Sequence, residues 1–504
     1  MSEVEVAGDL DSIPFDPADA KAALAQLPHR PAVFALYGAE AHAEPYVGRT
    51  PNLRARLDRL LQPSAKHPRR LQLAGRVRRI EWRLTGSDFE SLLTQFSLLE
   101  QIYGPKVLER MHLRHPALVR FLGGNRYPRI VVTHRPSRRE GGWAYGPFPS
   151  HAAAERFADE ALKLFLLRRC TDDLDPDPSH PGCVYSEMKM CLAPCYKGCT
   201  DERYGEEAAA VESFLATRGD SRLVVLRAAR DEASARLEFE SAAAIHAQVQ
   251  RSEAVRALAA ELVRPLSQLR AVILMPSANP NEVAVFLFEN ARLRGPVGFS
   301  TVGMRIQNEQ AGSTSLFAQP MAIEPVPEDL PITQVTNLAD TMLHPSIAAQ
   351  EASSVSGFDF SRAENSQQGA GALQAAEKLT ALKGHDFSRA TKPIESTLAS
   401  APAEAPAGTA PAKLPRSLLE SRMEAALVSL GDGFEAPSPT VRQGHLALLK
   451  RWYYRPEARR EGEIFFPDAE GRWPVKALLR GVGRVAGKML AVANPARQLD
   501  KQNS

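Results

Sequence analysis

The sequence predicts an α+β protein of several domains, and three observations support this fold class. A chain of 504 residues is longer than one hydrophobic core normally serves. Short β-type runs alternate with amphipathic helical patterns in its first quarter. All five cysteines fall between positions 170 and 199, in a segment rich in Pro, Gly and Asp. We therefore expect a small α/β domain at the N-terminus, followed by a cysteine-rich segment and further units.

The composition by itself favours no class of partner. Lys and Arg number 62 against 59 acidic residues, for a formal net charge of +3, so a nucleic-acid surface would have to be local. The N-terminal stretch is acidic and lacks the apolar core of a signal peptide, and no run of about 18 apolar residues occurs. We expect a cytoplasmic protein with no membrane partner. In that reducing compartment, clustered cysteines hold a metal more often than they form disulfides.

The patterns divide the chain into seven predicted regions. Between 321 and 412 the sequence is dominated by Ala, Ser, Pro, Thr and Gln, a composition that cannot bury enough apolar area to offset ordering. In chain order, the regions are a flexible tail (1–22), an α/β domain (23–112), a connector with the cysteines (113–200), an α-helical hairpin (201–262), a β-hairpin region (264–320), a disordered linker (321–412) and a small, mostly helical, basic C-terminal region (413–492).

The N-terminal domain reads as strands and helices in alternation. PAVFALYG and PYVGR are β-rich runs separated by small residues, as in a hairpin. NLRARLDRLLQ has leucines at helical spacing with arginines between them. RIEWRLTG predicts a third strand, and SDFESLLTQFSLLEQIYG predicts a helix that begins with a Ser or Asp cap.

The remaining regions follow the same logic. RIVVTHR predicts a strand and AAAERFADEALKLFLLRR a helix, and 269–302 alternate like a β-hairpin. Residues 221–262 are helix formers that break only near LEFES, which predicts two antiparallel helices. In the C-terminal region, PRSLLESRMEAALVSL and TVRQGHLALLKRWYYR have helical spacing. The facing residues expected in the hairpin are Leu226, Ala233 and Leu237 on one helix and Ala243, Ile245 and Val249 on the other.

The cysteine spacing points to an inorganic centre. Four thiolates from one short segment can close a tetrahedral zinc site or hold an iron–sulfur cluster. The spacing alone leaves zinc and iron–sulfur open, because the CxxC pairs typical of zinc are absent. The cysteines are Cys170, Cys183, Cys191 and Cys195, with Cys199 further on.

GCVYSEMKMCLAPC, with the preceding RRC, closely resembles the cysteine segment of the UvrC family, whose members are nuclease subunits of bacterial nucleotide excision repair. The resemblance implies a [4Fe-4S] cluster on Cys170, Cys183, Cys191 and Cys195, with zinc as the alternative. NRYPRIVVTHR and YGPFPS resemble the connecting segment of the same family.

The N-terminal region resembles a GIY-YIG nuclease with altered residues. Ala32-Val33-Phe34 stands at the first triad and Tyr46-Val47-Gly48 at the second. The resemblance implies catalytic roles for Tyr46, Arg49 and Arg56, but the positions of two further tyrosines and of the metal-binding glutamate hold Phe34, Leu60 and Gln95. Glu90 and Glu100 lie five residues to either side of Gln95, off its helix face, and are expected to be solvated. A metal such as Mg²⁺ is expected only if the nuclease is active.

Two further surfaces are expected to bind partners. Basic residues outnumber acidic ones between 54 and 83, which favours phosphate contacts with DNA. ARLEFESAAAIHAQVQ resembles the UVR hairpin through which UvrC contacts UvrB, and this implies a UvrB-like partner at Phe239, Ala243 and Ile245. The expected DNA-binding residues are Arg54, Arg69, Arg70, Arg76, Arg78 and Arg79. In the tail, KRWYYRPEARR adds aromatics that either stack on bases or lie in a core.

These features together predict a UvrC-like DNA-binding protein of nucleotide excision repair. Its GIY-YIG domain would be degenerate, and its role in incision accessory or weak. Of the second nuclease domain of the family, only the leading strands within 269–302 are recognisable. The alternatives are an active structure-specific DNA endonuclease and a non-catalytic protein-interaction module.

Overall fold

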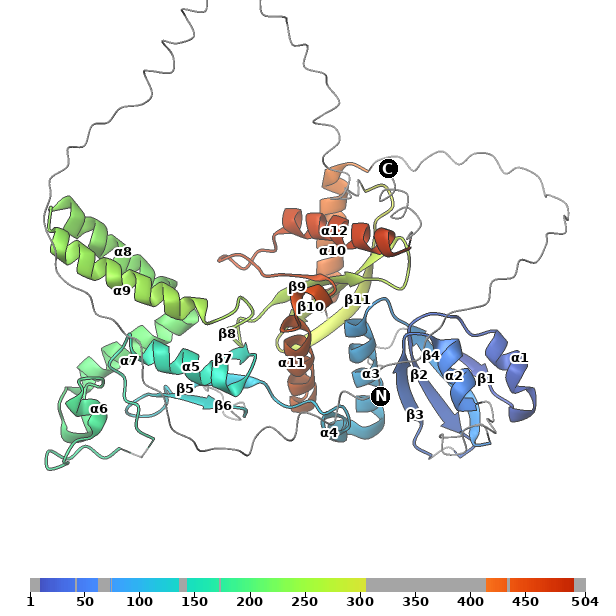
Figure 1. Cartoon of the computed structure of the whole chain (residues 1–504), viewed down its shortest axis with the longest axis horizontal. Helices are drawn as coiled ribbons and strands as arrows, with labels where there is room; N and C mark the ends of the chain where they lie inside the picture. Colours follow the sequence, from blue (N-terminus) through green and yellow to red (C-terminus); the bar gives the residue numbers. More distant parts are fainter. Residues whose placement is uncertain are drawn as a thin grey trace, which may run out of the picture. The chain divides into compact units, whose positions relative to one another are not determined.

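The computed structural model describes residues 10–40, 43–61, 73, 75–135, 143–171, 174–304, 414–432 and 436–493. These residues build three four-stranded antiparallel sheets with helices packed against them (Figure 1). The linker predicted for 321–412 lies outside the described residues, as do Arg69 and Arg70.

The N-terminal sheet has the strand order β1-β4-β2-β3. Its strands are β1 (Asp11–Pro14), β2 (Ala32–Gly38), β3 (Tyr46–Thr50) and β4 (Val77–Leu84). Helices α1 (Ala20–Ala25) and α2 (Leu53–Leu61) supply leucines to its core. The flexible tail predicted for 1–22 is wrong for residues 11–14, because β1 pairs with β4 and Phe15 is buried next to it.

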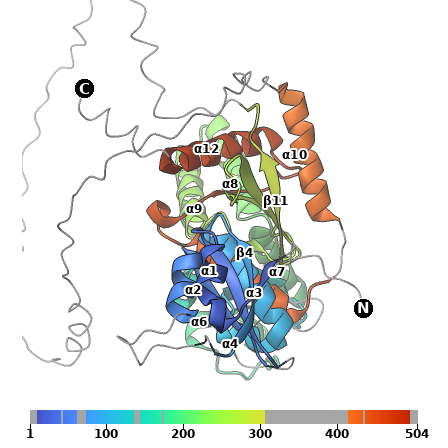
Figure 2. The same cartoon turned by 90° about the vertical axis from the view of Figure 1, so that its right-hand side faces the viewer.

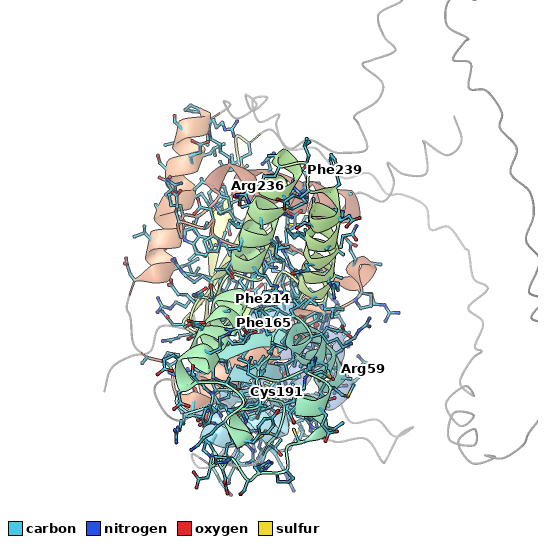
Figure 3. The ribbon with its side chains drawn as sticks, turned by 90° about the vertical axis from the view of Figure 1, so that its left-hand side faces the viewer. Arg59, Phe165, Cys191, Phe214, Arg236 and Phe239 are labelled. Atoms are coloured by element: carbon cyan, nitrogen blue, oxygen red, sulfur yellow. The ribbon has the colours of Figure 1, made fainter. Side chains whose placement is uncertain are left out.

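The second sheet has the order β6-β5-β7-β8 and belongs to the middle of the chain. Its strands are β5 (Ala117–Phe121), β6 (Ile130–Thr133), β7 (Trp143–Phe148) and β8 (Arg264–Pro265). Helices α5 (His151–Leu162) and α7 (Asp201–Ala216) pack on it, and short α6 (Val184–Glu187) lies between them in sequence. Phe165 and Phe214 meet edge to face with ring centroids 5.4 Å apart (Figure 3).

The predicted helical hairpin is formed by α8 (Asp220–Ala235) and α9 (Phe239–Ala257), which run side by side (Figure 1). Ala233 and Val249 are buried as expected. Leu237 and Ala243 are exposed, so their predicted place in the helix interface is wrong. The chain reverses between α8 and α9 through Leu237, whose positive φ of 62° marks the turn, so residues at this end lie beyond the interface.

The third sheet, β11-β10-β9-β12, joins distant parts of the sequence. It contains β9 (Ala271–Pro276), β10 (Glu282–Glu289), β11 (Arg292–Ser300) and β12 (Glu463–Phe465). Alternate residues of β9 and β10 enter two different cores, so both faces of the sheet are covered. The C-terminal segment is therefore part of this layered unit and not the separate region predicted for 413–492.

The helices that cover the two faces come from the C-terminal part of the chain, except for α3. One face is covered by α10 (Arg416–Gly431) and α12 (Val475–Ala493), which lie beside β11 in Figure 2. The other is covered by α3 (Asp88–Tyr103) and α11 (Pro439–Tyr453), with short α4 (Val107–Arg110) after α3. Phe89 of α3 packs at 5.4 Å from Phe286 and 5.5 Å from Trp452, measured between ring centroids. Helix α3 thus links the N-terminal sheet to the layered unit built around the third sheet.

In the part of the chain that the structure describes, no helix is both long and apolar enough to cross a bilayer.

Candidate functional site

The residues predicted for nuclease chemistry come from β2, β3 and α2. Tyr46 begins β3, Arg49 follows on the same strand, and Arg56 lies on α2. Phe34 of β2 is fully buried with its ring centroid 6.1 Å from that of Tyr46. A Cβ atom added at Gly48 would lie 2.7 Å from the Phe34 ring, so β3 needs a glycine where it passes this ring. Leu60 is also buried, so the substituted positions 34 and 60 are core positions.

Helix α3 carries Gln95, the residue predicted to stand where the resemblance implies a metal-binding glutamate. Gln95 is half-buried there and offers only an amide. Glu90, predicted to be solvated, is instead 4% exposed, and its carboxylate accepts a hydrogen bond from the Gly86 amide at 2.8 Å. Burial raises the pKa of Glu90 above its ordinary value, although the Gly86 hydrogen bond and the charge of Arg83 oppose this shift. The prediction failed because α3 is buried on more than one side, so a residue off the Gln95 face is still inside.

A charge network that the sequence did not reveal lies at the start of α3. Asp88 forms an ion pair with Arg49 of β3 through one carboxylate oxygen. Its other oxygen accepts from Arg455, which follows α11, at 2.5 Å. Burial raises the pKa of Asp88, but the Arg455 hydrogen bond and the charges of both arginines outweigh it and hold the pKa below its ordinary value. Arg49 is therefore already engaged by a carboxylate.

The predicted DNA-binding arginines line α2 and β4. Arg54 and Arg56 are partly exposed on α2, while Arg76 and Arg78 are exposed at the start of β4. Among the described residues, Arg54, Arg56 and Arg76 form no ion pair with a carboxylate. Arg79 pairs with Glu81 at 3.0 Å and lies 4.3 Å over the Tyr37 ring. The described part of this surface thus keeps several uncompensated cations.

The five cysteines occupy the irregular segment between α5 and α7. All are free thiols, and Cys195 is buried while the others are half-buried. The backbone around them bends sharply, with Ala193 and Lys197 in the left-handed region at φ of 53° and 60°. Cys191 Sγ accepts a hydrogen bond from the Ala193 amide at 3.2 Å. Amide hydrogen bonds to sulfur of this kind tune thiolate-bound metal centres.

The four predicted ligands affect one another electrostatically. Burial, with a smaller contribution from the nearby thiols of Cys170, Cys183 and Cys195, raises the pKa of Cys191 to about 11, although the Ala193 hydrogen bond opposes this shift. No three His, Cys, Asp or Glu side chains within the described ranges are gathered closely enough to hold a metal ion. The thiols thus lie near one another but do not form a metal site in this arrangement. Thiolates repel one another until a cation binds between them.

Arginine chemistry beside the cysteines also suits an anionic group. Arg169, which directly precedes Cys170, has buried Nε and Nη2 atoms with no hydrogen-bond partner among the described residues. Buried donors of this kind are costly when unsatisfied. A negatively charged thiolate centre next to Arg169 would stabilise them, so the residues present fit such a group.

The far end of the α8–α9 hairpin exposes apolar side chains. Phe239 is 67% exposed and Leu237 is 71% exposed at this end, whereas the exposed Val224 and Val225 lie near the start of α8, away from it. Figure 3 places Arg236 and Phe239 together at this end, well away from Cys191. Of the other predicted partner-binding residues, Ala243 is exposed and Ile245 is half-buried. Exposed apolar groups concentrated at one site are typical of an interaction surface.

The comparisons with known proteins converge on one family. The model of the UvrC/Cho excinuclease middle domain matches residues 118–214. UvrABC system protein C of Alcanivorax borkumensis is 32% identical over 243 residues, which is 48% of this chain and 39% of the relative. The protein of the same name from Aliivibrio salmonicida is 33% identical over 239 residues, 46% of this chain and 38% of the relative. No solved structure matches the chain.

The chain spans less than two fifths of the length of these curated relatives. The matched middle domain begins in β5 and ends in α7, so it contains all five cysteines and the β5, β6 and β7 strands of the second sheet, but not β8. Through this domain and through relatives at about 30% identity over half its length, the chain is similar to proteins of the UvrC family.

Proposed function

We propose that this protein binds DNA in nucleotide excision repair and acts as an accessory or weakly active relative of the excinuclease subunit. The observation that carries the proposal is the match to the UvrC/Cho middle domain at 118–214, which follows a surface whose described part keeps arginines without carboxylate partners and precedes a hairpin with an apolar tip. A cationic surface of this kind binds phosphates without reading sequence.

The residues of the nuclease-like module favour binding over efficient cutting. Phosphodiester hydrolysis needs a base for the attacking water, a cation for the developing charge and usually a carboxylate-bound metal. Phe34 and Leu60 carry no hydroxyl, and Gln95 carries no carboxylate. Loss of a positioned proton acceptor alone costs about 10²–10⁴-fold in rate. We expect only trace incision of a damaged or branched duplex with Mg²⁺ or Mn²⁺; efficient incision abolished by Arg56→Ala would instead establish an active endonuclease.

DNA binding should depend on the arginines of α2 and β4. Arg56→Ala and Arg76→Ala should each weaken binding of a labelled duplex and reduce the slope of log affinity against log salt by about 1, because each removes one phosphate contact. Fluorescence anisotropy over a salt series measures both quantities. Arg422→Ala, which removes an exposed charge from α10, is the matched control. Binding that is absent or insensitive to salt would favour the interaction-module alternative.

For the cysteines, we propose a [4Fe-4S] cluster held by Cys170, Cys183, Cys191 and Cys195, with zinc as the alternative. Such a centre would accept an electron, and it would also link the loops of the cysteine segment to one another. Protein purified without oxygen should be brown and contain about four iron atoms per chain. Cys191→Ser should lose the colour and the iron, and Cys199→Ser should keep both. Stoichiometric zinc would reject the cluster, and equal loss in both variants would reject the ligand assignment.

The apolar tip of the hairpin is proposed to dock a UvrB-like protein. Phe239 offers the largest exposed ring there, and aromatic side chains dominate the energetics of such contacts. Phe239→Ser should weaken co-purification with a UvrB-like partner at least tenfold. Val428→Ser, which alters an equally exposed apolar residue on α10, should leave it unchanged. Equal retention by both variants would remove the tip from the interface.

A further inference from the structure

Asp88 connects two arginines that come from opposite ends of the sequence. It is the first residue of α3, and it pairs with Arg49, 39 residues before it, and with Arg455, 367 residues after it. One carboxylate therefore holds two guanidinium groups, which leaves one net positive charge at this point.

This trio is open to solvent. The side chains of Asp88 and Arg49 are each 36% exposed, and that of Arg455 is 26% exposed. Ion pairs this exposed contribute little to stability. A guanidinium carries five N–H donors, and a carboxylate contact uses only one or two of them, so both arginines retain donors for a further anion.

The segment that carries Arg455 is basic on its accessible side. Trp452 is buried in the core and donates through Nε1 to the Glu461 carbonyl at 2.9 Å, and the Tyr454 hydroxyl donates to the Pro147 carbonyl. These rings are thus not available to stack on bases. Lys450, Arg451 and Arg459 form no ion pair with any carboxylate in the described ranges. The chain here presents cations to solvent while its aromatic rings anchor it.

We propose that Arg455 and Arg49 form one phosphate-binding site for the DNA backbone, with Asp88 fixing their mutual position. The site extends the cationic surface of the N-terminal module onto the C-terminal segment at 450–460. The inference rests on the proposed DNA-binding function and adds Arg455, which belongs to the basic run KRWYYRPEARR but was not singled out by any motif or family match. Asp88 partly neutralises the site, so it also limits how strongly a phosphate is held.

The test measures binding of a labelled duplex to the full chain over a salt series. Arg455→Ala should weaken binding roughly five- to tenfold at about 0.1 M salt and lower the salt slope by about 1, as expected for one lost phosphate contact. Arg455→Lys, which keeps the charge, should retain most of the affinity. Asp88→Asn should tighten binding, because both arginines lose their neutralising partner. Arg422→Ala on α10, whose helix packs on the other face of the third sheet, should bind as the unaltered chain does.

The outcomes separate this inference from the function on which it rests. If Arg455→Ala binds normally while Arg56→Ala is weakened, the Arg455 site is rejected and the DNA-binding function stands. If neither variant is weakened, both are rejected. If Asp88→Asn lowers the melting temperature without tightening binding, the trio is only a structural clamp. Circular dichroism verifies that each variant is folded. If Arg455→Ala is not folded, Asp88→Asn decides, because binding that does not tighten in this variant would reject the site.

Discussion

Replacing Gly444 by alanine is expected to lower the free energy of unfolding by about 1–3 kcal/mol. Gly444 lies in α11, where a Cβ atom would sit 2.2 Å from Cε2 and 2.3 Å from Cζ of Phe96 on α3. The Phe96 ring cannot easily move away, because it is buried and also packs against the His445 ring, with the two ring centroids 5.1 Å apart. The two helices would have to separate. Urea unfolding followed by circular dichroism measures the loss.

A second helical glycine provides the matched control for Gly444. Gly483 lies in α12, and no described atom is within 4 Å of the position where its Cβ would be. Gly483→Ala should therefore stabilise the protein by about 0.5–1 kcal/mol, because alanine loses less backbone entropy in a helix. The same chemical change is thus expected to have opposite signs at the two sites. A stabilising Gly444→Ala would show that α3 and α11 do not pack together.

Elements with a strong local signal could be predicted from the sequence. The sequence predicts a Ser or Asp cap for α3, and the cap is Ser87, whose hydroxyl accepts from the Glu90 amide at 3.1 Å. The leucine spacing of 52–62 likewise predicted α2, all of whose leucines are buried. In each case the interactions that determine the helix lie within a few residues of one another, so the periodicity and the capping residues are enough to predict it.

The assembly of the third sheet could not be predicted in this way. Strand β12 pairs with β9 so that Ile464 faces Ile273, across a sequence separation that includes the linker. A three-residue strand has too few positions to show alternation of apolar and polar residues. Its pairing partner depends on which strand edge and apolar surface the rest of the fold leaves uncovered. The C-terminal helices accordingly appeared to be a separate region.

The same limit applies to the candidate site. The identities of Phe34, Leu60 and Gln95 were enough to predict a degenerate nuclease site, because the chemistry of a side chain can be read from the sequence. The Arg49–Asp88–Arg455 network depends on α11 docking beside α3, which no local pattern encodes. A charge run such as KRWYYRPEARR could therefore suggest a basic surface but not the residue it would meet.

The stability of the folded protein should fall as pH is lowered below about 6.5, owing to His445. This side chain is 4% exposed, and its Nδ1 accepts a hydrogen bond from the Leu293 amide at 2.9 Å. Burial lowers the pKa of His445 to about 3, assisted by the charge of Arg292. The unfolded chain takes up a proton near the ordinary value of 6.5, whereas the folded protein does not. Between these values the free energy of unfolding should decrease by on the order of 1 kcal/mol per pH unit.

His445→Asn isolates this contribution, because asparagine does not titrate and its Oδ1 can accept from the Leu293 amide in place of Nδ1. His115 also has a pKa lowered by burial, so both proteins should lose some stability in acid. Carboxylates such as Asp88, whose pKa is lowered, add a common loss at still lower pH. Urea unfolding at several pH values from about 7 down to about 4.5 gives the free energy of unfolding of each protein. The difference between the two free energies should change steadily as pH falls, because only the unaltered protein loses the His445 contribution. If the free energies of unfolding of the two proteins fell equally with pH, the imidazole could become protonated without disrupting the contact between α11 and β11.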